Sequence, residues 1–113
     1  MLCPHQVTFG GDFLGPSVLS TLDQGKHIVD LFNKIDPHMI TCFGNHEVDV
    51  PYQALRQRIS EFKGTWLNTN MPAFEPVLPH HIVKNLAADD GTPDARAVAF
   101  LGLLIGGKGF ENT

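Results

Sequence analysis

The sequence predicts an α/β fold in which a βαβαβ unit is followed by a β-hairpin. Short apolar runs end in polar, glycine-containing loops, and the stretches between these runs carry helical periodicity. Two further apolar runs near the end of the chain flank a turn-forming segment. The chain has 113 residues and a hydrophobic content of 42%, which suits one small domain with one core.

The first half of the chain predicts a strand, two helical segments and a second strand. Residues 7–9 read as a short buried strand. Ser17 or Ser20 can open the next helical segment, which Gly25 interrupts. A longer helix starts near Lys26 and stops at Asp36 before a proline. Its apolar residues, which are expected to face the core, are Ile28, Leu31, Phe32 and Ile35.

The second half begins with an expected strand over residues 39–43. Pro51 suits the first turn of a helix that ends near Lys63 and Gly64. Residues 65–67 read as a third strand, and a loop with three prolines follows over 71–79. A strand is expected to start at 81–83, and residues 89–94 read as a turn. Residues 97–105 form an apolar strand of the buried kind, which we expect to pair with 81–83 as a hairpin.

Charge and composition exclude several classes of function. Eight Lys and Arg against twelve Asp and Glu leave a formal net charge of −4, so a nucleic acid is not an expected partner. Cys3 and Cys42 are too few for a disulfide framework and are expected to be reduced thiols. The sequence shows no apolar run of membrane-spanning length and no pattern of a signal peptide, and it leaves the compartment open.

Polar residues gather where the first two predicted strands end. Asp12 follows the first strand, and Asn45, His46, Glu47 and Asp49 follow the second. Parallel strands that are joined through a helix bring their carboxyl ends to one edge of a sheet, which is where α/β folds place their chemistry. We therefore expect these side chains to form one site.

The pair of loops resembles a known family. Gly11-Asp12, followed by the hexapeptide that runs from Gly44 to Asp49, resembles the calcineurin-like metallophosphoesterases. Ser17 and the later segment 67–70 make it similar to the branch of 5′-nucleotidases and 2′,3′-cyclic-nucleotide phosphodiesterases. The resemblance covers about residues 7–105. It implies a four-layer α/β/β/α sandwich that hydrolyses phosphomonoesters with water activated by two divalent ions.

The resemblance also implies roles for single residues. Asp12 would bridge the two metal ions, and Asn45 would be a neutral oxygen ligand to one of them. His46 would stabilise the transition state or act as general acid, and Asp49 would be its partner. Mn, Zn, Fe, Co and Mg are not distinguished. The substrate would be a small phosphorylated molecule, with nucleotides among the candidates, and no substrate-binding residue is identified.

Each residue also has a purely structural interpretation. Asp12 could cap the helix that follows it, and Asn45 could be a turn residue that bonds its own backbone. His46 could be an ordinary loop histidine, and Asp49 could cap the next helix. For Glu47 a structural hydrogen bond is expected. Helix capping by Ser17, and a turn at Asn70, stay open beside a supporting role in the site.

The family's other motifs have no counterpart in the sequence. No Asp-x-His precedes Asp12, and no Gly-His-x-His follows residue 109, so residues 1–113 are expected to be a partial calcineurin-like phosphoesterase domain. Two oxygen ligands are fewer than two cations require. Two functions therefore stay open. One is metal-dependent phosphoester hydrolysis, and the other is that of a catalytically inactive fragment or remnant acting as a binding module.

Overall fold

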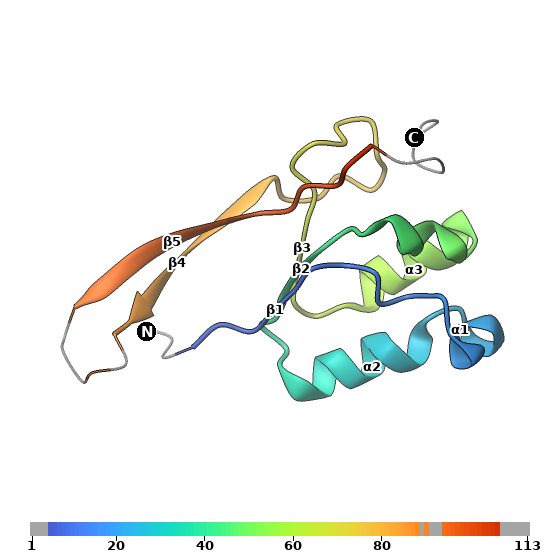
Figure 1. Ribbon diagram of the computed structural model, residues 1–113, viewed down its shortest axis with the longest axis horizontal. Coiled ribbons are helices and arrows are strands. Elements are labelled where there is room, and N and C mark those ends of the chain that lie inside the picture. Colours follow the sequence, from blue (N-terminus) through green and yellow to red (C-terminus); the bar gives the residue numbers. More distant parts are fainter. Residues whose placement is uncertain (1–4, 89, 91–93, 107–113) are drawn as a thin grey trace.

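The computed structural model describes residues 5–88, 90 and 94–106, and it has the expected order of elements (Figure 1). A parallel sheet holds β1 (Thr8–Phe9), β2 (Ile40–Cys42) and β3 (Thr65–Leu67) in the order β1-β2-β3. β4 (His81–Ala87) and β5 (Ala95–Leu101) pair antiparallel as a separate hairpin. The βαβαβ unit and the hairpin are thus confirmed. The turn expected at 89–94 lies largely outside the described residues.

Three helices and one 3₁₀ turn connect the strands of the parallel sheet. They are α1 (Val18–Asp23), α2 (Lys26–Ile35), α3 (Tyr52–Glu61) and η1 (Asn45–Asp49). The helices lie to one side of the sheet, and the hairpin extends away on the other (Figure 1). The molecule is therefore elongated, with extents of 46 × 28 × 19 Å. Among the described residues, no helix has the length and apolar character needed to cross a membrane.

The core contains a cluster of aromatic rings around Trp66. Its ring centroid lies 5.0 Å from that of Phe13, 5.3 Å from Phe43 and 5.9 Å from Phe62. Such spacings are typical of favourable tilted and edge-to-face ring pairs. Phe13 and Phe43 come from the segments that directly follow β1 and β2, so the packing that stabilises the core also positions the two polar loops.

The burial expected for β1 was wrong, and that expected for α2 was wrong in part. β1 is exposed rather than buried, and Phe9 retains 41% of its accessible surface. In α2 Phe32 is buried and Ile28 packs against the core, as expected. Leu31 and Ile35 are instead 48% and 59% exposed. β1 lies at an edge of the sheet and is paired on one side only. The helix likewise has an apolar stripe wider than the surface that covers it.

The last apolar run is also not a buried strand. β5 ends at Leu101, and its residues are exposed or half-buried. Leu103 and Ile105, inside the expected strand, lie beyond it and are 63% and 91% exposed. β4 and β5 pair only with each other, so among the described residues no further strand extends this small sheet. Cys42 is a free thiol, whereas Cys3 lies outside the described residues.

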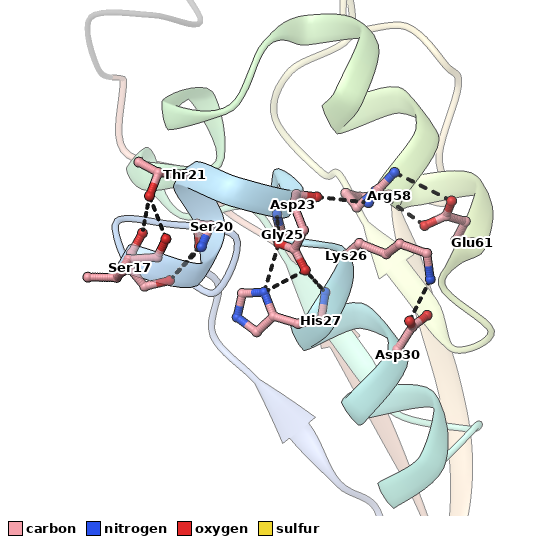
Figure 2. A network of polar contacts seen from close by, with 11 residues as sticks. Ser17, Ser20, Thr21, Asp23, Gly25, Lys26, His27, Asp30, Arg58 and Glu61 are labelled. Atoms are coloured by element: carbon pink, nitrogen blue, oxygen red, sulfur yellow. Dashed lines mark hydrogen bonds and ion pairs between the residues drawn. The ribbon is translucent and has the colours of Figure 1, made fainter.

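A polar network joins α1 to α2 (Figure 2). The Asp23 carboxylate accepts hydrogen bonds from the backbone N–H groups of Gly25 and His27, at 3.1 and 2.7 Å. His27 also places Nδ1 2.9 Å from Asp23 Oδ1. Desolvation raises the pKa of Asp23, but the side-chain and backbone bonds from His27 outweigh it, so the pKa is lowered. Asp23 therefore satisfies the N-terminal donors of α2.

Arg58 ties α3 to this junction. It is 4% exposed, and its guanidinium donates to the Asp23 backbone carbonyl at 3.3 Å. Its Nε lies 3.2 Å from Glu61 Oε2 (Figure 2). A buried guanidinium requires such partners, because an unpaired buried charge is costly. One side chain thus connects α3 to the corner where α1 meets α2.

We predict that Asp23→Ala lowers the free energy of unfolding by about 1–2 kcal/mol, because α2 loses a side-chain acceptor for its first N–H groups. Urea denaturation followed by circular dichroism measures the change. Asp30→Ala is the matched control, since it removes an exposed ion pair with Lys26, and exposed pairs contribute little. Equal losses in the two variants would contradict the assigned role of Asp23.

Candidate functional site

The loops after β1 and β2 meet backbone against backbone. β1 and β2 are neighbours, with Phe9 opposite Thr41, so both loops leave the same edge of the sheet. A Cβ on Gly11 would overlap the backbone of Gly44, and one on Gly44 would overlap the carboxylate of Asp12. Gly11 also has φ of +89°, a conformation that favours glycine. The two glycines therefore permit the approach.

Glu47 fastens the two loops together from the inside. Its side chain is completely buried. Oε2 accepts hydrogen bonds from the backbone N–H groups of Asp12 at 3.0 Å and Gly44 at 2.5 Å. Oε1 accepts from Phe13 at 2.9 Å and, more weakly, from Leu14 at 3.4 Å. The structural hydrogen bond expected for Glu47 is confirmed, and it holds both loops.

The charge of Glu47 is held in a nearly dry environment. Burial raises the pKa of its carboxyl, and the four backbone N–H groups lower it without cancelling the rise. A buried carboxylate is tolerated when such donors replace its lost water. Glu47 is therefore committed to the backbone of the loops, and its hydrogen bonds leave it no role as a ligand.

Asp12 lies at the surface where the loops meet. Its Oδ1 accepts a hydrogen bond from the backbone N–H of His46 at 2.9 Å. The cap of α1 is instead Ser17, whose Oγ accepts from the backbone N–H of Ser20. Asp12 thus does not cap the helix that follows it, and its carboxylate faces the start of η1. It has φ of +58°, an uncommon conformation for a residue with a side chain.

His46 and Asp49 form a pair within η1. Nδ1 of His46 lies 2.8 Å from Oδ2 of Asp49, and their side chains are 42% and 37% exposed. The hydrogen bond that the His46 ring donates to the Asp49 carboxylate is the main cause that raises the pKa of His46. It also leaves Nε2 as the ring atom that can exchange a proton with a ligand. The first residues of α3 have no side-chain cap, so Asp49 does not cap that helix.

Asn45 is exposed at the start of η1. Its side chain makes no hydrogen bond to any residue that the structure describes, so the turn bond considered as the structural alternative is not formed. The site edge therefore presents a carboxylate from Asp12, an amide from Asn45 and an imidazole from His46. These groups can bind a cation, accept hydrogen bonds and transfer a proton.

The donor set does not fit a two-metal centre by itself. The described part of the chain contains no group of three or more His, Cys, Asp or Glu side chains arranged to hold a metal ion. Asp12 and Asn45 offer hard oxygen ligands of the kind that divalent cations bind. A stable site needs its full set of ligands, and these two side chains are only part of one.

The central role of Glu47 was the feature that sequence reasoning missed. A carboxylate three residues after Gly44 has the spacing of a capping box, and this spacing is the one available signal. The bonds to Asp12, Phe13 and Leu14 cross more than 30 residues of sequence, so no local pattern reports them.

Comparison with known proteins leaves the site to be judged on its own geometry. No protein-family model, no curated protein and no solved structure matches the chain. The resemblance to the metallophosphoesterases therefore rests on the motif residues and on their placement at one edge of the sheet.

We predict that Glu47→Gln lowers the free energy of unfolding by about 3 kcal/mol, the scale of hydrogen bonds to a buried charged group. Either orientation of the amide turns its NH₂ group toward two backbone N–H donors. Urea denaturation measures the loss. Glu75→Gln, in an exposed loop, is the matched control and should be neutral. An unchanged free energy of unfolding in the Glu47→Gln variant would show that the four hydrogen bonds contribute little to stability.

We predict that Asp49→Asn lowers the pKa of His46, because the charged hydrogen-bond acceptor is lost. The raised pKa means that the folded chain favours the imidazolium. The stability contributed by the pair is thus present below the ordinary histidine pKa and is lost as pH rises through the raised value. NMR titration of the imidazole resonances in metal-free protein measures the pKa. Asp23→Asn, at the other Asp–His pair, is the control and should leave the pKa of His46 unchanged.

Proposed function

We propose that this chain carries part of a calcineurin-like phosphoesterase site, and that its function is the hydrolysis of a phosphomonoester in which His46 gives a proton to the leaving oxygen. The observation that carries the proposal is the contact between His46 and Asp49 at the edge where Asp12 and Asn45 also lie. An imidazole paired with a carboxylate is a suitable general acid near neutral pH.

The backbone supports this assignment. The backbone N–H of His46 donates to Asp12 Oδ1 at 2.9 Å, and Glu47 accepts from the backbone N–H groups of Asp12 and Gly44. His46 is therefore held against the Asp12 loop by its main chain, while Asp49 orients its ring. A proton donor with a fixed position contributes more than a mobile one, because the leaving group need not search for it.

The proposed hydrolysis requires divalent cations, and the described residues supply only some of the ligands that such cations need. Asp12 and Asn45 are the oxygens that would take part, and the remaining ligands would have to come from elsewhere. Two cations, when bound, would supply an activated water. The four-layer sandwich belongs to the same proposal, in which the parallel sheet and the hairpin would be parts of its two central layers.

The incomplete donor set favours a second candidate function, that of a binding module without turnover. The observation behind it is that the described residues contain no group of three His, Cys, Asp or Glu side chains placed to bind a metal ion. Such a module would fold and remain monodisperse without metal, and added metal would leave it inactive. The two candidates therefore differ in whether Mn²⁺ induces hydrolysis, and this is measurable on the same preparation.

We predict that His46→Gln lowers the turnover of phenyl phosphate by roughly 100-fold or more, the scale of lost acid catalysis. The turnover of p-nitrophenyl phosphate should fall much less, because its leaving group departs without a proton. Both rates are measured on the 113-residue chain with Mn²⁺. His27→Gln is the matched control, since His27 pairs with Asp23 away from the loops. Equal losses on both substrates would contradict the acid role of His46, and no turnover by the wild type would contradict hydrolysis by this chain alone.

A further inference from the structure

A pocket adjoins the His46–Asp49 pair on the side of α1. It has a volume of about 280 Å³ and is lined by residues of the segment 15–21 together with Asp49 and Val50. Asp49 belongs to both places, since it lines the pocket and its Oδ2 accepts from His46. A group bound in this pocket would therefore contact the carboxylate that is paired with His46.

One of the two serine hydroxyls that line the pocket is free to donate a hydrogen bond to a ligand. Ser17 Oγ and Ser20 Oγ lie 2.7 Å apart and share one hydrogen bond, which uses one of their two hydroxyl protons. Ser17 Oγ also accepts from the Ser20 backbone N–H at 3.0 Å. The other hydroxyl proton has no acceptor among the described residues. The serine pair can thus donate one hydrogen bond into the pocket.

Asp49 supplies the matching acceptor. Its Oδ2 is engaged by His46, and its Oδ1 has no hydrogen-bond partner within the described residues. A ligand hydroxyl can donate to Oδ1 while a neighbouring hydroxyl accepts from the serine pair. A phosphate does not suit this place, because the Asp49 carboxylate would repel it. The pocket is therefore matched to neutral groups that carry more than one hydroxyl.

The orientation of α1 supports a function for its hydroxyl face. Ser20 is 7% exposed, whereas Val18 and Leu22 on the same helix are 81% and 79% exposed. Apolar burial alone would turn the helix the other way. Figure 2 shows Ser17, Ser20 and Thr21 gathered at the start of α1 and linked by hydrogen bonds. The first-turn amide of Ser20 is already bonded, so the side chains, rather than the helix terminus, form the site.

We propose that this pocket binds the alcohol portion of the substrate, and that it selects phosphate esters of polyols, with the Ser17–Ser20 pair and Asp49 binding neighbouring hydroxyls. As a subsite for the leaving group, it rests on the proposed function. Its binding chemistry stands apart, because a free polyol can occupy the pocket without any hydrolysis.

The test is an NMR titration of the ¹⁵N-labelled chain with ribitol and, in parallel, with 1-pentanol, which has five carbons but one hydroxyl. We expect saturable shifts with ribitol at the amides of Ser20, Thr21 and Val50, and none with 1-pentanol. No saturable shift with ribitol, or equal binding of 1-pentanol, overturns the proposal. Inorganic phosphate that binds at these same amides also overturns it.

Variants assign the binding to the hydroxyls. Ser17→Gly combined with Ser20→Ala should weaken ribitol binding about tenfold, the scale of one or two hydrogen bonds, and glycine retains most of the cap. Thr21→Leu, which narrows the pocket while the Ser17 and Ser20 hydroxyls remain, should weaken ribitol binding as well. Leu22→Ala, on the outer face of α1, is the matched control. Unchanged affinity in both pocket variants, with α1 intact by circular dichroism, contradicts the assignment.

Failure of this inference and failure of the proposed function give different results. If ribitol binds but no phosphoester is hydrolysed, the polyol pocket is supported and hydrolysis by this chain is contradicted. If phenyl phosphate and glycerol phosphate are hydrolysed at equal rates and ribitol does not bind, the polyol pocket is contradicted and the hydrolase function is supported.

Discussion

The buried carboxylate of Glu47 is the interaction on which the arrangement of the site depends. It accepts from the backbone of Asp12 to Leu14 on one loop and from Gly44 on the other. Removal of a charge from water costs several kcal/mol, and it is tolerated only where good donors surround the group. The donors exist only when both loops are in place, so formation of the site and burial of this charge are a single event.

The aromatic core also holds the loops after β1 and β2 together. Phe13 and Phe43 follow Asp12 and precede Gly44, and both rings pack on Trp66 from β3. The polar loops are thus held by apolar contacts on one side and by Glu47 between them. His46 and Asp49 then need only the short η1 turn to place an imidazole and a carboxylate at the surface. Rigid support beneath a small polar edge is the general requirement for a preorganised site.

The sequence predicts the order of elements because its signals are local. Apolar runs, proline, glycine and a period of 3.6 residues define the strands and helices, and parallel pairing then predicts that Asp12 and His46 come together. Burial of β1, of β5 and of Leu31 and Ile35 in α2 was predicted wrongly, because burial depends on which partner covers an element. The same limit applies to Glu47, whose partners lie more than 30 residues away, and to the pocket formed by Asp49 and the serine pair.

The exposed apolar side chains affect how the molecule behaves in solution. Val83, Leu101, Leu103 and Ile105 are 54% to 91% exposed on or next to the hairpin, and Val18 and Leu22 are exposed on α1. A net charge of −4 is the main repulsion between copies, and salt screens it while leaving apolar attraction in place. Solubility therefore falls as ionic strength rises, and low-salt buffer well above the isoelectric point, where the net charge is strongly negative, is a better solvent for this chain than concentrated saline.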